Sequence, residues 1–174
     1  YLEGDNIFST VCDDKSAVEQ AVSLLIESGH RDILYLYSSY SYSGVNKLEG
    51  YKKALRTHGI PLRQEMIRQC PKDVEASRDL LLSLDRQGIF FDAVMTSDDS
   101  LAVGAVKYAH ARDISIPDNL SIIGYNNSLL ALCTDPEITS VDTKVEALCT
   151  TTVNTLMGVF SGVNVPSRTT IASD

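Results

Sequence analysis

The stretch of sequence that decides the fold is DAVMTSDDSLAVGAVKYA, residues 92–109. Its first apolar run, 93–96, has the length of a buried strand, and the polar residues 97–99 end it. Residues 100–112 carry apolar side chains at helical spacing, and LSIIGYNN (120–127) repeats the pattern of a buried strand followed by a polar corner. Two such strands joined by a helix predict a βαβ unit with parallel strands.

The two polar corners are the first candidates for a ligand site. Open parallel sheets bind ligands just beyond the carboxyl ends of their strands, which predicts that Asp98 and Asn126 face a small molecule. Asp98 and Asp99 also form a candidate acid–base or metal-binding pair. Because adjacent residues at a strand end diverge, the sequence favours Asp98 as the ligand-binding residue and Asp99 as a helix cap.

The rest of the chain repeats the alternation of strand and helix. Further strands are predicted at 6–12, 33–37, 64–69, 138–141 and 168–172, and further helices at 13–29, 45–58, 73–87 and 143–161. This alternation, which runs from Asn6 to Tyr125, predicts an α/β fold with a doubly wound parallel sheet.

Composition and charge exclude several classes of function. The 174 residues carry a net charge of −8 and no run rich in lysine and arginine, so this stretch is not expected to bind a nucleic-acid backbone by itself. No apolar run approaches the roughly 20 residues of a membrane helix. The first residues lack an initiator methionine, which predicts a piece of a longer protein, and they lack the regions of a signal peptide. Scattered single cysteines without a secretory signal predict a cytoplasmic protein. The cysteines form no C-x-x-C pair, which predicts reduced thiols and no zinc site: Cys12, Cys70, Cys133 and Cys149.

The remaining polar residues predict binding, not catalysis. The sequence contains no nucleophile elbow, phosphate-binding loop or dinucleotide-binding turn, so we expect no catalytic residue, cofactor or metal. A polar rim is expected from residues that follow strands or begin helices: Asp13, Ser43, Lys47, Asp98 and Asn126. Tyr40 and Tyr42 offer aromatic faces to a ring-shaped ligand, although their loop, 38–44, has the alternative role of a solvated connector.

Five segments occur in an order and spacing that resemble one protein family. They are SGHRDI (28–33), GYKKAL (50–55) followed by GI (59–60), the stretch 96–105, IPDNLSIIGY (116–125) and the stretch 136–141. Together they resemble the effector-binding core of the lactose/galactose-repressor (LacI/GalR) family of bacterial transcription regulators. The resemblance implies two flavodoxin-like subdomains of the type I periplasmic-binding-protein kind. It also implies a small effector in the cleft between them and an amino-terminal helix-turn-helix headpiece that reads operator DNA.

The same resemblance implies a division of this chain. Residues 11–132 and 168–174 are expected in the carboxy-terminal subdomain, and residues 1–10 and 138–162 are expected to be segments of the amino-terminal subdomain. The DNA-binding headpiece is absent and the core is truncated at both ends, so the chain is expected to provide one wall of the effector cleft. Operator DNA is then bound only through the absent headpiece.

Effector contacts carry over from the family residue by residue. Lys47 stands where arginine is common, and Asn126 stands where an aspartate often accepts sugar hydroxyls. Asp98 matches the acidic or amide residue after the strand, and the pair Cys12-Asp13 aligns with an Asp-Asn pair. We expect a small polar effector, with a sugar favoured over a purine.

Formation of a homodimer through the carboxy-terminal subdomain is a further expectation from the family. The matching surfaces are the helix 100–112, which contains Leu101, and the apolar run with Leu129, Leu130 and Leu132. The alternative is that both pack in the core of the chain itself.

Two other functions remain open on the sequence. A periplasmic sugar-binding protein of a transporter shares the bilobed fold, although GHR (29–31) and SIIGY (121–125) look more like the regulators. The second is an α/β enzyme that uses Asp98 or Asp99.

Overall fold

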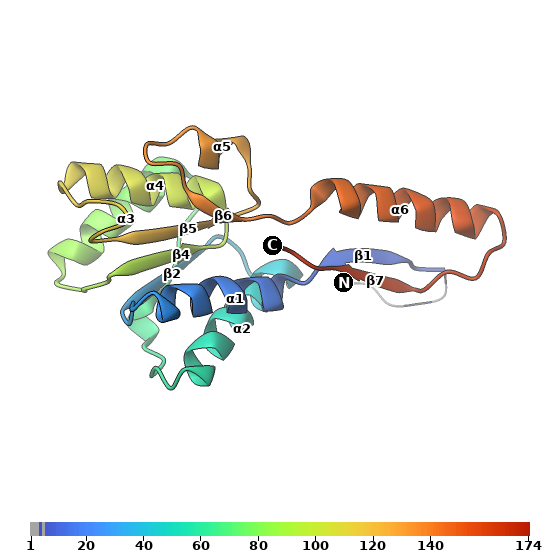
Figure 1. Cartoon of the computed structure of the whole chain (residues 1–174), viewed down its shortest axis with the longest axis horizontal. Coiled ribbons are helices and arrows are strands. Elements are labelled where there is room, and N and C mark those ends of the chain that lie inside the picture. Colours follow the sequence, from blue (N-terminus) through green and yellow to red (C-terminus); the bar gives the residue numbers. More distant parts are fainter. Residues whose placement is uncertain (1–3, 5) are drawn as a thin grey trace.

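The chain forms two parts, which a computed structural model describes for residue 4 and residues 6–174 (Figure 1). We call the larger part the body; it contains a five-stranded sheet and the helices packed against it. The smaller part, the arm, contains a two-stranded sheet and one long helix and extends away from the body. Within the described part of the chain, no helix has the length and apolar character needed to cross a membrane.

The sheet of the body is parallel throughout, and its strand order is β3-β2-β4-β5-β6. Every residue of β2 and β4 is buried, because these central strands have helices on both faces. This arrangement confirms the predicted doubly wound α/β fold. The strands are β2 (Ile33–Tyr37), β3 (Ile67–Gln69), β4 (Ala93–Thr96), β5 (Ser121–Tyr125) and β6 (Thr139–Val141).

Two hydrophobic cores lie on opposite faces of this sheet. Side chains alternate along a strand, so Tyr35 packs with α1 and α2 while Leu34 and Leu36 pack with α3 and α4. A single helical turn, α5, contacts the outer side of α4, and a short 3-10 turn, η1, precedes β3. The helices are α1 (Asp14–Glu27), α2 (Tyr42–Thr57), α3 (Val74–Arg86), α4 (Asp99–Ala111) and α5 (Leu129–Leu132), and η1 spans Gln64–Met66.

The arm pairs two strands that are far apart in the sequence. β1 (Ser9–Cys12) runs parallel to β7 (Arg168–Ile171), and α6 (Val145–Phe160) lies alongside them (Figure 1). None of the residues of α6 is buried. The arm therefore presents an apolar helix surface that nothing in the described part of the chain covers: Val145, Val153, Leu156, Met157 and Phe160.

The observed strand pairing differs from the expected division of the chain. The sequence predicts 168–174 in the subdomain of the large sheet, but β7 pairs with β1 in the arm. It predicts 138–162 together in the other subdomain, but β6 pairs with β5 in the body and α6 alone lies in the arm. Of the expected segment 1–10, residues 1–3 and 5 lie outside the described residues. Pairing is a contact between distant segments, and a three-residue strand carries little signal for its partner.

The boundary of α2 also differs from the prediction. The helix begins at Tyr42 and not at Val45, because Ser41 caps it by accepting a hydrogen bond from Gly44 N at 3.1 Å. Tyr42 and Ser43 therefore lie in the first helical turn and not in a loop.

Helices α3 and α4 approach closely at Gly104. A Cβ atom on Gly104 would lie 2.4 Å from Ser77 Cβ and 2.5 Å from Val74 O. Ser77 is fully buried, and its hydroxyl donates to Leu101 O at 2.8 Å, which fixes the two helices at this spacing.

Gly104→Ala should lower the free energy of unfolding by about 1–3 kcal/mol, because the added methyl group forces two packed helices apart. Urea titration followed by circular dichroism measures the change. Lys107→Ala, on the exposed side of the same helix, should change it by no more than about 1 kcal/mol. Equal stability of Gly104→Ala and the natural chain would contradict the close packing.

Candidate functional site

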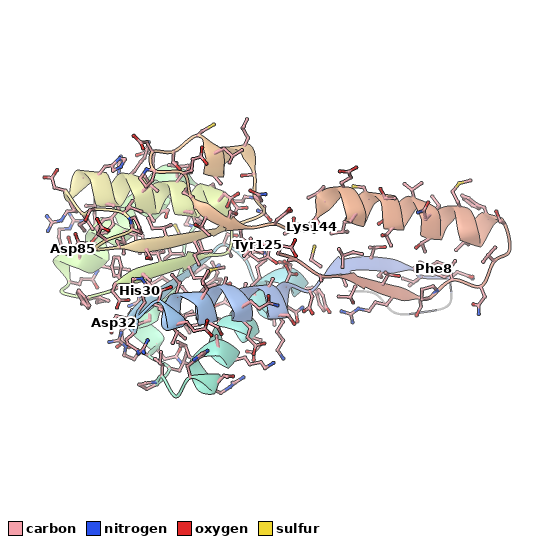
Figure 2. The ribbon with its side chains drawn as sticks, in the orientation of Figure 1. Phe8, His30, Asp32, Asp85, Tyr125 and Lys144 are labelled. Carbon is pink, nitrogen blue, oxygen red and sulfur yellow. The ribbon has the colours of Figure 1, made fainter. Side chains whose placement is uncertain are left out.

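A polar rim lies at the carboxyl end of the large sheet, on the side of the body that faces the arm. Figure 2 shows Tyr125, the last residue of β5, at this edge, with Lys144 at the base of the arm helix. The rim contains Asp98 after β4, Asn126 after β5 and Lys47 on α2, so the three principal predicted contacts come from neighbouring elements.

Asp98 is the centre of the rim. Its Oδ1 accepts hydrogen bonds from Ser100 N (3.0 Å) and Ser100 Oγ (2.7 Å), so Asp98 caps α4. Its Oδ2 accepts from Asn126 Nδ2 (2.9 Å) and pairs with Lys72 Nζ (2.6 Å). Burial raises the pKa of Asp98, but the hydrogen bonds from Lys72 and Ser100 outweigh it and hold the pKa below its usual value. The rim thus contains a carboxylate that stays ionised.

Asp99 has a different role from the one that the sequence predicts. The cap of α4 is Asp98, so the assignment of Asp99 as the cap is wrong. Asp99 is buried, and its Oδ2 accepts from both N and Oγ of Ser128 at 2.7 Å while its Oδ1 accepts from Ser140 Oγ at 2.6 Å. A Cβ atom on Gly124 would lie 2.2 Å from the same Oδ1. Asp99 therefore ties α4 to β6 and to the start of α5.

Asn126 reaches Asp98 because the chain turns sharply after β5. Its φ is 102° and that of Asn127 is 48°, a left-handed backbone region that asparagine tolerates better than most residues. Asn126 N also donates to Val141 O at 3.0 Å, which extends the pairing between β5 and β6 by one bond. The turn thus holds the amide against the Asp98 carboxylate.

Lys47 is a buried member of the rim. Its Nζ donates to Ser97 O at 3.1 Å and lies 3.5 Å from the centre of the Tyr125 ring and 4.0 Å from Asp14 Oδ1. Burial lowers the pKa of Lys47, while the charges of Asp14 and Asp98 oppose that change. Lys47 therefore links three elements of the rim through its contacts with Ser97, Tyr125 and Asp14.

Two charged residues that contribute to the rim, Asp14 and Lys72, were not among the predicted site residues. Asp14 is buried and accepts the Tyr125 hydroxyl at 2.7 Å, and Lys72 pairs with Asp98. Asp14 follows Asp13 in the sequence, and Asp13 caps α1 by accepting from Ser16 N at 3.1 Å. The pair of acidic residues at this helix start was the available signal, whereas nothing in the sequence relates Lys72 to Asp98.

The two tyrosines of the predicted aromatic wall have separate surroundings. Tyr40 is 65% exposed, and its hydroxyl is hydrogen-bonded to that of Tyr37, with the two rings edge to face at 5.1 Å. Tyr42 is turned toward the arm, where its hydroxyl accepts from Arg168 Nη2 at 2.5 Å. Ser43 lies in the first turn of α2. Tyr40 is thus the more exposed of the two rings and is held by Tyr37 within the body.

The predicted dimer residues also separate into two groups. Leu101 is fully buried in the core between the sheet, α3 and α4, so its assignment to a dimer surface is corrected. The spacing of apolar residues places Leu101 on one face of a helix but does not say that α3 covers that face. On α5, Leu129, Leu130 and Leu132 are 74%, 45% and 56% exposed.

The largest cavity volumes described for the body, about 470 and 360 Å³, belong to cavities whose walls contain none of the rim residues. The larger cavity lies between α1 and β6, with Ala17, Leu24 and Val141 in its wall. Among the residues that the structure describes, no three His, Cys, Asp or Glu side chains are grouped to hold a metal ion. The rim is a group of hydrogen-bonding side chains at the edge of the body that faces the arm, and small ligands are bound where protein surrounds most of their surface.

Known proteins are similar to this chain in both sequence and fold. The model of the periplasmic binding protein-like domain family matches residues 22–173. An HTH-type transcriptional regulator of Lachnoclostridium phytofermentans is 50% identical over all 174 residues, which make up 52% of that regulator. The chain spans about half the length of the relatives that it matches.

Two solved structures from Escherichia coli superpose on the chain. The transcriptional repressor AscG is 29% identical with a TM-score of 0.89, covering 99% of this chain and 64% of that one. A sugar-binding LacI-family transcriptional regulator complexed with phosphate is 30% identical with a TM-score of 0.86, covering 94% of this chain and 59% of that one. The chain belongs to the family of periplasmic binding protein-like domains, in the form found in the LacI/GalR transcriptional regulators.

Proposed function

We propose that this chain is the effector-sensing core of a DNA-binding regulator and that it binds a small neutral polyol, with a sugar as the favoured class. The observation that carries the proposal is the 2.9 Å contact between Asn126 Nδ2 and Asp98 Oδ2 at the carboxyl end of the sheet. A carboxylate accepts hydroxyl protons while an amide both donates and accepts, which suits neighbouring hydroxyl groups on one ligand. The exposed ring of Tyr40 adds a face for the C–H surface of a sugar ring.

The charges of the rim support a neutral ligand over an anionic one. Its two lysines already have partners, since Lys47 is buried against Ser97 and Tyr125 and Lys72 pairs with Asp98. The ionised Asp98 would repel an anionic effector, and both lysines of the rim are already paired with other groups. A carboxylate beside hydroxyl groups has no such cost.

The mechanism follows from the position of the rim between body and arm. An effector that contacts both parts stabilises one relative orientation of the two lobes, and the headpiece of the whole protein then changes its affinity for operator DNA. We place this protein in the cytoplasm as a homodimer, with α5 at the dimer surface. A transport protein or an enzyme has less support, because the matched relatives are transcriptional regulators and Asp98 and Asp99 bind different partners.

Asp98→Asn should weaken effector binding by about 10-fold or more, because it removes a charged acceptor and keeps a residue that caps helices well. Isothermal titration calorimetry of the full-length protein with glucose, ribose, cellobiose and a purine base measures the affinity. Arg63→Met, a change in a body residue that pairs with Asp32, serves as the control. An absence of heat with every sugar would overturn the proposed ligand class.

The charge of Asp98 makes a separate prediction about pH. Because the pKa of Asp98 is lowered in the folded chain, Asp98 stabilises the fold above about pH 4, and this contribution is lost as the pH falls through its folded pKa. Lys72→Ala should raise the pKa of Asp98, so the loss of stability begins at higher pH. Carboxyl-carbon NMR titration measures the pKa, and Lys52→Ala, whose partner is Glu49, should leave it unchanged. The same Asp98 pKa with and without Lys72 would refute the assigned cause.

Leu130→Asp should shift the protein toward monomer, because it places a charge in the apolar surface of α5. Sedimentation velocity over a range of concentrations should give a dissociation constant at least 10-fold higher than that of the natural protein. Leu24→Asp, at another exposed leucine, is the matched control and should keep the natural value. A monomeric natural protein, or a dimer untouched by Leu130→Asp, would exclude α5 as the interface.

A further inference from the structure

One side-chain contact joins the arm to the body away from the segments that connect them. Arg168, the first residue of β7, donates from Nη2 to the Tyr42 hydroxyl at 2.5 Å. The guanidinium carbon of Arg168 lies 5.8 Å from the centre of the Tyr42 ring, within the range of a cation–π contact. Tyr42 belongs to α2 in the body, so this contact crosses between the two parts.

Several further ties between the parts lie in or beside the connecting segments. Cys12 Sγ lies 3.6 Å from Thr143 O, and Asp13 N donates to Ile171 O at 2.9 Å. Asp142 and Asp174 exchange both backbone hydrogen bonds, at 2.8 and 3.1 Å. Contacts at a hinge can move with it as one unit, so they restrict rotation of the arm only weakly.

Arg168 lies farther from the hinge than these contacts. It is paired with Ser9, and Cys12 ends β1 three residues later, a distance of about 10 Å along the strand. A contact at this distance from the hinge opposes rotation of the arm with a larger torque than an equally strong contact within the connecting segments. The Tyr42–Arg168 contact therefore sets the orientation of the arm more strongly than the hinge contacts do.

The same contact lies next to the proposed effector wall. Tyr42 follows the exposed Tyr40 by two residues and precedes Lys47 by five on the same helix. A change in the orientation of the arm thus acts on the first turn of α2, the helix that also contains the rim residue Lys47.

We propose that Tyr42 and Arg168 form an interlobe latch, which fixes the arm against the body and so sets the fraction of molecules whose cleft is in the binding orientation. Effector affinity scales with that fraction, so losing the latch lowers the apparent affinity by the same factor. This assigns Tyr42 to the control of lobe orientation and Tyr40 to the ligand face. Only the link to affinity rests on the proposed function; the latch itself does not.

The latch is tested by a distance measurement without effector. Cys133, beside α5 in the body, and Cys149, on α6 in the arm, are both exposed and accept nitroxide labels in a Cys12→Ser, Cys70→Ala background. Double electron–electron resonance on the 174-residue chain then reports the orientation of the arm. The natural pair should give one narrow distance distribution.

Arg168→Met should broaden this distribution or shift its maximum, and Tyr42→Phe, which keeps the ring, should produce a smaller change of the same kind. The double variant should match Arg168→Met, because both changes remove one interaction. Arg63→Met should leave the distribution as in the natural chain. Circular dichroism of the same samples establishes that each variant is folded, as expected for two exposed residues.

The latch would be overturned if both Arg168→Met and Tyr42→Phe gave the same distance distribution as the natural chain. It would also be overturned if the change in the double variant equalled the sum of the changes in the two single variants. A retained latch in a protein that binds no sugar would overturn the proposed ligand class alone. The two proposals therefore fail separately.

Discussion

Two adjacent carboxylates at the end of β4 hold the functional edge of the body together. Asp98 faces the rim, where it caps α4 and accepts the amide of Asn126, while Asp99 faces inward and accepts hydrogen bonds from Ser128 and Ser140. Asp98 is the extended cap residue and Asp99 is the first residue of the helix, and the hydrogen bonds of the two side chains go to different partners, so one corner supplies both a ligand-facing acceptor and an internal tie. The position of every rim group relative to β6 and α5 depends on this corner.

The fold was predictable because its signals are local. Central strands such as β2 and β4 are buried on both faces and therefore read as continuous apolar runs, and helices show their period within a few turns. Which strand pairs with which is a property of distant segments. For this reason the sequence predicted both strands within one or two residues but assigned each to the wrong part: β6 lies in the body and β7 lies in the arm.

The site was predictable to the extent that topology alone positions it. Asp98 and Asn126 follow neighbouring parallel strands, so the rule that ligands bind at the carboxyl ends of strands predicts that they lie close together, as they do. The same rule is silent about which way a side chain turns. Tyr42 turns to Arg168, and Leu101 lies under α3, because partners from elsewhere in the chain decide both orientations.

The contact between Gly124 and Asp99 has a consequence for how this sequence can change. A side chain at 124 would occupy the space of the Asp99 oxygen, and that oxygen is the acceptor for Ser140, so a change at any of these three positions disturbs the contacts of the other two. A substitution at one of these sites therefore requires a compensating substitution at another. Three residues on separate elements are thus expected to change together, although they lie 41 positions apart at their widest.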